Sequence, residues 1–306
     1  MAIDRGQGKA DRIVEQGNNV FMQIYRSLDQ VKEAGAIAPD SIVNADCLEA
    51  MKLIPDKSID CIICDLPYGV TACKWDVVIP FDLLWEQYKR IIKPNGAIVL
   101  FGSQPFTSAL VMSNPKWFKY EWIWEKSKSP SALLANKQPL RYHENILMFY
   151  QKQPNYIPQK TFIGIQDRRA TFSRIKDNWK GHTDPNLFSQ SKQDTGWRFP
   201  KSIIKSNNSN KTGLLAPTQK PVALIEYLIK TYSIEGELIL DNTAGSGTLA
   251  IACINTNRRY ICIEKDPDYF EVMRNRIENH APNALVTPKK VKKPKAITEG
   301  QLALFG

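Results

Sequence analysis

The sequence lacks the features that mark several classes of protein. Its apolar runs fall well short of the ~20 residues that cross a bilayer, and charged residues such as Asp4, Arg5 and Lys9 interrupt its first stretch. It has only three histidines, and its six cysteines include one close pair, Cys61 and Cys64, with no second pair nearby. Because that pair lies in an apolar run, we expect reduced core thiols rather than a metal site. A cytoplasmic protein with no membrane segment is the expectation.

Positive charge is concentrated in two segments. The 306 residues include 41 Lys and Arg against 31 Asp and Glu, which gives a net charge of +10. Residues 151–216 hold twelve of the basic residues against four Asp, and residues 281–306 hold five Lys against one Glu. The rest of the chain is close to neutral. This distribution favours a polyanion bound at one place over a uniformly charged surface.

Apolar periodicity predicts alternating strands and helices on both sides of the basic segment 151–216. Buried strands are expected at 41–44, 58–64, 97–101, 120–124, 145–150, 237–241 and 259–263. Helices are expected at 20–31, 48–53, 81–92, 105–112, 218–232, 249–257 and 267–279. This alternation indicates an α/β fold with a doubly wound, mostly parallel sheet.

A strand, a glycine turn and a helix follow one another in residues 238–257. Two glycines one residue apart, Gly245 and Gly247, let the backbone pass close to a ligand. Glu264 ends the next strand, where a carboxylate can accept hydrogen bonds from a ribose diol. The third glycine of G-x-G-x-x-G is absent, since Ala250 stands there. The turn therefore suits a nucleoside better than a pyrophosphate, with a purely structural turn as the alternative.

The tetrad Asp65-Leu66-Pro67-Tyr68 directly follows a central strand, at the edge where open α/β sheets bind ligands. The Asp65 carboxylate and the Leu66 carbonyl can each accept a hydrogen bond from an exocyclic amine, which frees the nitrogen lone pair for attack. Pro67 stiffens the turn, and Tyr68 offers a ring face for an extruded base. The alternative is a proline-containing turn with a solvated Asp.

Three segments together resemble the β-class DNA amino-methyltransferases. Residues 65–68 resemble the catalytic D-P-P-Y tetrad, and with Gly69 they match its phage-type D-L-P-Y-G form. Residues 218–221 resemble the T-Q-K-P segment, and residues 241–248 resemble the D-x-x-x-G-S-G-T cofactor motif. Their order is the permuted order of that class, and the resemblance covers residues 41–280. It implies a Rossmann-like, seven-stranded methyltransferase sheet. Leu66 in place of the first proline, and Asn242-Thr243-Ala244 in place of a segment with Pro-Phe, are departures from the pattern.

The resemblance implies S-adenosyl-L-methionine as the cofactor and Asp65, Leu66, Pro67 and Tyr68 as the catalytic residues. Asp46 would contact the cofactor's adenine amine or serve as a helix N-cap, and the helix N-terminus at Lys220 would hold the methionine carboxylate. The full set of implied cofactor-binding residues is Asp46, Asp65, Lys220, Asp241, Thr243, Gly245, Ser246, Gly247, Thr248 and Glu264.

Adenine is the expected target base, because Asp at the first tetrad position is usual for adenine N6 and Ser for cytosine N4. A cytosine-N4 methyltransferase is the first alternative. The second is a DNA-binding protein that keeps the fold without turnover. A nicotinamide oxidoreductase is disfavoured by the missing third glycine and by the tetrad.

Five parts of the chain are expected: an N-terminal extension (1–40), a catalytic half (41–150), a target-recognition insert (151–216), a cofactor-binding half (217–280) and a basic tail (281–306). Double-stranded DNA is the expected partner of the insert, through Arg168, Arg169, Arg174, Lys176, Arg198, Lys201 and Lys205. The tail ends in Gln301–Phe305, which resembles the Q-L-x-L-F peptide that docks into the bacterial sliding clamp. Relatives of the β class are often dimers. The sequence decides neither whether this chain forms a homodimer nor whether a restriction enzyme accompanies it.

Overall fold

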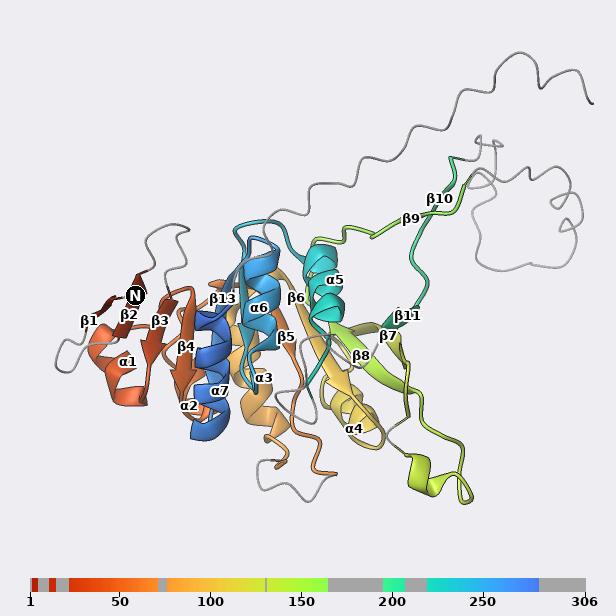
Figure 1. The fold of residues 1–306 in the computed structure, drawn as a ribbon, viewed down its shortest axis with the longest axis horizontal. Helices are drawn as coiled ribbons and strands as arrows, with labels where there is room; N and C mark the ends of the chain where they lie inside the picture. Colours follow the sequence, from red (N-terminus) through yellow and green to blue (C-terminus); the bar gives the residue numbers. More distant parts are fainter. Residues whose placement is uncertain are drawn as a thin grey trace, which may run out of the picture.

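The computed structural model describes residues 2–4, 11–14, 22–70, 76–129, 131–164, 195–206 and 219–280 (Figure 1). An 11-stranded sheet runs through this described part. Its strands lie in the order β1 (Ala2–Asp4), β2 (Asp11–Val14), β3 (Met22–Tyr25), β4 (Ser41–Asn44), β13 (Arg259–Glu264), β12 (Leu238–Asp241), β5 (Ile59–Cys64), β6 (Ile92–Gly102), β8 (His143–Phe149), β7 (Phe118–Lys126) and β11 (Ile203–Ser206).

The predicted seven strands form the centre of this sheet, from β4 to β7. The neighbours from β3 to β6 pair in parallel, whereas β8 is antiparallel to both β6 and β7. The expectation of a mostly parallel, Rossmann-like sheet is therefore confirmed. Beyond it, β1 to β3 extend one edge and β11 extends the other.

The predicted helix at 20–31 is wrong in its first half. Residues 22–25 form β3, which pairs in parallel with β4, and helix α1 (Leu28–Ala34) begins only after Ser27, whose hydroxyl caps it. Met22, Ile24 and Tyr25 are buried. These residues form a strand because pairing with the sheet edge and burial of their side chains outweigh the weak helical periodicity of a short segment.

Helices cover both faces of the sheet (Figure 1). α1 lies with α2 (Cys47–Met51), α3 (Phe81–Ile91) and α4 (Phe106–Ser113), and the other face carries α5 (Val222–Tyr232), α6 (Thr248–Asn255) and α7 (Pro267–Glu278). Alternate residues of β5 serve the two layers, since Cys61 and Ile63 pack with α5 to α7 and Ile62 and Cys64 pack with α1 to α4. Burial on both faces explains the continuous apolar run of this strand.

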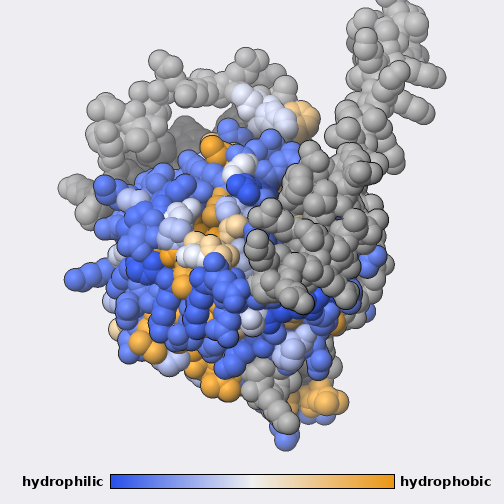
Figure 2. All heavy atoms as spheres, turned by 90° about the vertical axis from the view of Figure 1, so that its left-hand side faces the viewer, coloured by the Kyte–Doolittle hydropathy of each residue, from blue (hydrophilic) through white to orange (hydrophobic). Residues whose placement is uncertain are grey.

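The elements outside these layers are short. They are the 3₁₀ turn η1 (Ala132–Leu134), which lies between β7 and β8, and the hairpin of β9 (Thr161–Phe162) with β10 (Trp197–Arg198). Cys47, Cys61, Cys64, Cys253 and Cys262 are buried free thiols, as expected. Among the described residues, no helix is long and apolar enough to span a bilayer. Where residues are described, the face shown in Figure 2 is mostly hydrophilic with small scattered apolar spots.

Candidate functional site

Four carboxylates gather where the parallel strands end. Asp46 follows β4, Asp65 follows β5, Asp241 ends β12 and Glu264 ends β13. The parallel pairing of these strands places all four ends at one edge of the sheet. There they line a cavity of about 960 Å³. The position agrees with the general rule that open α/β sheets bind ligands outside the carboxyl ends of their strands.

The structure brings the tetrad and the glycine turn into contact. The Thr243 hydroxyl donates a hydrogen bond to the backbone carbonyl of Asp65 at 3.1 Å. The strands that precede the two segments are neighbours, with Ile239 opposite Cys61 and Leu240 opposite Ile62. Residues 178 positions apart in the chain therefore share one cavity wall.

The glycine turn is held from three directions. Glu264 accepts the backbone N–H of Gly245 at 2.7 Å, and the Ser246 hydroxyl donates to Gln219 at 3.1 Å. Arg276 of α7 donates to the Ser246 carbonyl and to the Thr248 hydroxyl at 3.0 and 3.1 Å. These bonds fix the turn before any ligand arrives.

Asn242 accounts for one departure from the family pattern. Its side-chain oxygen accepts hydrogen bonds from the Cys64 thiol at 2.8 Å and from the Tyr88 hydroxyl at 2.5 Å. The Asn242 N–H also donates to the Cys64 sulfur at 3.2 Å. An amide at this position thus joins the glycine turn to the end of β5 through buried hydrogen bonds.

The tetrad is also tightly held. The Tyr68 hydroxyl donates to Asp65 Oδ1 at 2.6 Å, and its ring stacks on Phe106 with 5.0 Å between centroids. Burial, and then the Asp65 charge, raise the pKa of Tyr68 well above its usual value, so the hydroxyl remains a donor. Just beyond, the N–H groups of Gly69 and Val70 donate to the Asp76 carboxylate at 2.8 and 2.9 Å.

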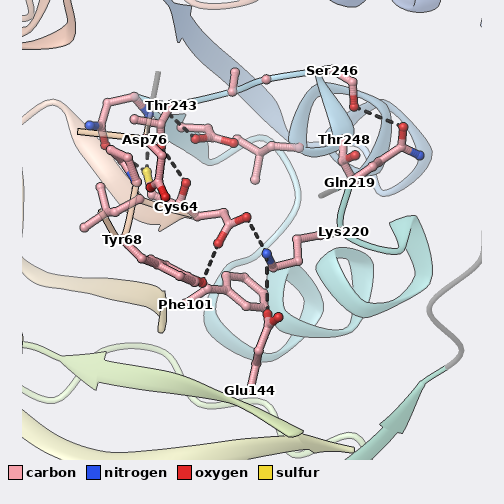
Figure 3. Close-up of a pocket in the computed structure, with 18 of the residues that line it drawn as sticks. Cys64, Tyr68, Asp76, Phe101, Glu144, Gln219, Lys220, Thr243, Ser246 and Thr248 are labelled. Carbon is pink, nitrogen blue, oxygen red and sulfur yellow. Dashed lines mark hydrogen bonds and ion pairs between the residues drawn. The ribbon is translucent and has the colours of Figure 1, made fainter. Parts of the chain in front are cut away.

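Lys220 has a side-chain partner that the sequence did not indicate. Its ammonium forms an ion pair with Asp65 Oδ2 and lies 3.4 Å from Glu144 Oε2 (Figure 3). Glu144 in turn pairs with Lys126 at the end of β7. Burial lowers the pKa of Lys220, but Asp65 and Glu144 outweigh it and raise that pKa above its usual value. A carboxylate at the start of the apolar strand β8 was the available sequence signal for Glu144.

Asp46 is the N-cap of helix α2, which is the second of the two roles expected for it. Its carboxylate accepts the N–H of Leu48 at 3.0 Å and pairs with Lys265 at 3.1 Å. The helix after residue 220 begins at Val222 with Pro221 as its N-cap, so Lys220 lies just before its first turn.

The candidate DNA contacts are only partly within the described ranges. Lys201 and Lys205 are exposed and Arg198 is half-buried, and Lys205 forms a 3.2 Å ion pair with Glu125. Arg168, Arg169, Arg174 and Lys176 lie outside the described residues, as do Thr218 and the segment Gln301–Phe305.

Comparison with known proteins identifies a family. The N6_N4_Mtase family model, described as DNA methylase, matches residues 59–275. The chain is 27% identical over 250 residues to the Type II methyltransferase M.HpaI of Haemophilus parainfluenzae, which covers 78% of this chain and 74% of that protein. It is 27% identical over 268 residues to the DNA adenine methyltransferase YhdJ of Escherichia coli, with 83% and 88% covered.

Two solved structures have a similar fold. The cytosine-N4-specific PvuII DNA methyltransferase gives a TM-score of 0.59 at 16% identity, with 81% of this chain and 90% of that chain covered. The complex of M1.HpyAVI with SAM gives a TM-score of 0.52 at 22% identity, with 77% and 98% covered. Both likenesses concern the fold of the described sheet and helices.

The two glycines of the turn should differ in their tolerance of alanine. Gly245 and Gly247 have φ values of 52° and 77°, so either alanine pays about 1 kcal/mol of left-handed strain. A Cβ on Gly247 would lie 2.6 Å from Met273 Cγ, whereas one on Gly245 meets nothing within 4 Å in the part of the chain that the structure describes. We expect Gly247→Ala to lower the free energy of unfolding by roughly 1–3 kcal/mol more than Gly245→Ala does, because the new methyl group overpacks the core. Urea unfolding of both variants measures this, and equal losses would contradict the packing shown.

Asp241 should make the protein less stable as the pH rises. Burial raises the pKa of Asp241 to about 7, and the side chain accepts the N–H of Thr243 at 3.1 Å. Because the folded pKa lies above the unfolded one, the stabilisation is complete below about pH 4 and is lost as the pH rises towards 7. Asn keeps the hydrogen bond and does not titrate.

We therefore expect Asp241→Asn to gain stability relative to the natural protein between pH 5 and pH 8, by roughly 2 kcal/mol. Unfolding in urea at the two pH values measures the change. Asp82→Asn, at an exposed carboxylate in α3, is the matched control. If the difference in unfolding free energy between Asp241→Asn and the natural protein were the same at pH 5 and pH 8, Asp241 would already be ionised in the folded protein.

Proposed function

The chain belongs to the N6/N4 family of DNA methylases, and from this premise we propose that it methylates the N6 amine of adenine in double-stranded DNA. S-adenosyl-L-methionine is the methyl donor. The observation that carries the proposal is the contact between Thr243 and Asp65, since it joins the turn expected to hold the donor to the tetrad expected to hold the base.

The residues at the rim suit this donor. Asp46, Asp65, Asp241 and Glu264 surround the cavity with carboxylates, which favour a ligand that carries a sulfonium and an ammonium group. Apart from its chain neighbours, no described residue has an atom within 4 Å of the position of a Cβ on Gly245, so a ligand can approach the backbone there. The two Glu264 oxygens accept the backbone N–H groups of Gly245 and Asp266, and a carboxylate has room for a further donor such as a ribose hydroxyl. The cavity of about 960 Å³ is large enough for a nucleoside and an extruded base.

The chain's own residues bind and orient the base. The Asp65 carboxylate and the Leu66 carbonyl accept the two N–H bonds of the amine, and the hydrogen bond from Tyr68 sets the orientation of the carboxylate. When bound, the donor supplies a methyl group that is already activated on sulfur. Positioning of the two reactants then provides most of the acceleration, and water takes the proton that the amine loses.

Adenine rather than cytosine is proposed because Asp65 occupies the first position of the tetrad, and because a relative of similar length is named a DNA adenine methyltransferase. Residues 151–216 are proposed as the target-recognition insert, with Arg198, Lys201 and Lys205 as the candidate DNA contacts that lie within the described residues. Contacts from such residues to phosphates would make binding weaken steeply with salt.

Substitution of Asp65 tests the proposed reaction. We expect Asp65→Ala to lower methyl transfer roughly a hundredfold or more while the affinity for duplex DNA barely changes, because the carboxylate positions the amine and does not hold the backbone. Labelled methyl incorporation and gel-shift titration measure the two quantities. Glu49→Gln, at a surface ion pair of α2, is the control that should keep full activity.

The product distinguishes the target base. Genomic DNA from cells that express the protein should contain new N6-methyladenine at one sequence, detectable by nucleoside analysis and by sequencing of modified bases. N4-methylcytosine at that sequence would identify the chain as a cytosine enzyme. Binding of DNA without any new methylated base would support the non-catalytic alternative.

We also propose that the tail docks into the sliding clamp through Gln301–Phe305, because a short apolar peptide on a lysine-rich arm suits a groove next to DNA. Removal of residues 301–306 should abolish clamp capture by the tagged protein and leave methyl transfer on short duplexes intact. Equal capture by both forms would contradict this role.

A further inference from the structure

Four charged side chains of alternating sign form a row along the cavity. Asp65 pairs with Lys220, Lys220 lies 3.4 Å from Glu144, and Glu144 pairs with Lys126. The side chains of Lys220, Glu144 and Lys126 are only 10%, 14% and 11% exposed. Desolvation of such charges is costly unless each has an opposite neighbour. The alternating order meets that requirement at every position.

The Lys220 ammonium is bound to an oxygen of Asp65, the carboxylate that accepts the amine in the proposed reaction. The Tyr68 hydroxyl binds Asp65 Oδ1 and Lys220 binds Oδ2 (Figure 3). An amine that enters would share the carboxylate with a cation. That cation would also oppose the positive charge that develops on the attacking nitrogen. The arrangement seen here therefore places a cation on the carboxylate that the amine of the base must approach.

The Glu144 carboxylate is a second possible ion-pair partner for the Lys220 ammonium. Its Oε2 atom is buried and accepts no hydrogen bond from the described part of the chain, although it is 3.4 Å from Lys220 Nζ. Lys126 holds the other oxygen and so fixes the carboxylate. The Phe101 ring lies 5.2 Å from the ammonium and presents a π-system beside it. A short movement of the ammonium would replace one carboxylate with the other and would not leave the cation unpaired.

We propose that Lys220 is a latch on Asp65, and that Glu144 is a positioning residue that receives the Lys220 ammonium when the amine of the target base enters. The inference rests on the proposed function, because it takes Asp65 as the acceptor of that amine. A purely structural Lys220, which only holds Asp65 in place, leads to the opposite expectation when Lys220 is removed.

The test compares Glu144→Gln with the double variant Lys220→Met/Glu144→Gln, which loses one charge of each sign. The substrate is a duplex with the methylated sequence found by genomic mapping, carrying 2-aminopurine in place of the target base. For Glu144→Gln we expect kcat/KM on the natural duplex to fall roughly ten- to hundredfold, as for a lost hydrogen bond to a charged group. The fluorescence rise on base entry should fall with it, while duplex affinity stays unchanged. The unfolding midpoint should also fall, because Glu144→Gln leaves the buried Lys126 ammonium without its carboxylate partner.

The double variant should recover base entry to at least the natural level, because no ammonium remains to be moved. Activity and fluorescence of Glu144→Gln equal to those of the natural protein would overturn the latch. A double variant no better than Glu144→Gln would also overturn it and favour the structural role. Methyl transfer by the natural protein is measured first. If the natural protein transfers no methyl group, the proposed function fails and the latch fails with it. If it does, the outcomes above test the latch alone.

Discussion

The pairing of β12 with β5 is the constraint on which the site depends. These strands come from distant parts of the chain, yet Leu240 lies opposite Ile62, so the residues that follow each strand emerge side by side. Thr243 then reaches the Asp65 carbonyl, and Asn242 reaches Cys64. A shift of one residue in this register would turn the alternating apolar side chains of the strands to the wrong layer. Burial of two hydrophobic clusters thus fixes the relative position of the tetrad and the glycine turn.

The same geometry imposes an electrostatic cost. Parallel strands that end at acidic residues or just before them bring Asp46, Asp65, Asp241 and Glu264 around one cavity. The chain offsets this charge in different ways: Lys220 pairs with Asp65, Lys265 pairs with Asp46, and backbone N–H groups bind Glu264. Asp241 has no cationic partner among the described residues, and burial accordingly raises its pKa. A cationic ligand would complete this neutralisation.

Local patterns in the sequence predict much of this arrangement. The seven central strands follow from apolar runs, and Asp65 and Gly245 are placed by the rule that ligands bind at strand ends. The strand β3 does not follow, because its four residues carry a weak period and gain their stability from an edge of the sheet. The roles of Glu144 and Lys126 do not follow either. Their partner Lys220 is far along the chain, and only the three-dimensional sheet order makes them neighbours.

Leu66 departs from the family's tetrad at a position where the proposed reaction would use a backbone group. Leu66 contributes a carbonyl, which any residue has, and its apolar side chain is buried in the layer that includes α2 and α3. Asn242 replaces a residue of the usual pattern and binds Cys64 and Tyr88, so the turn gains hydrogen bonds in exchange for an aromatic contact. By contrast, the proposed reaction would use the Asp65 side chain itself, which is bound by Tyr68 and Lys220 at once. Leu66 therefore departs from the family's pattern where the proposed reaction would use a main-chain carbonyl, whereas Asp65 matches the pattern where that reaction would use a side chain.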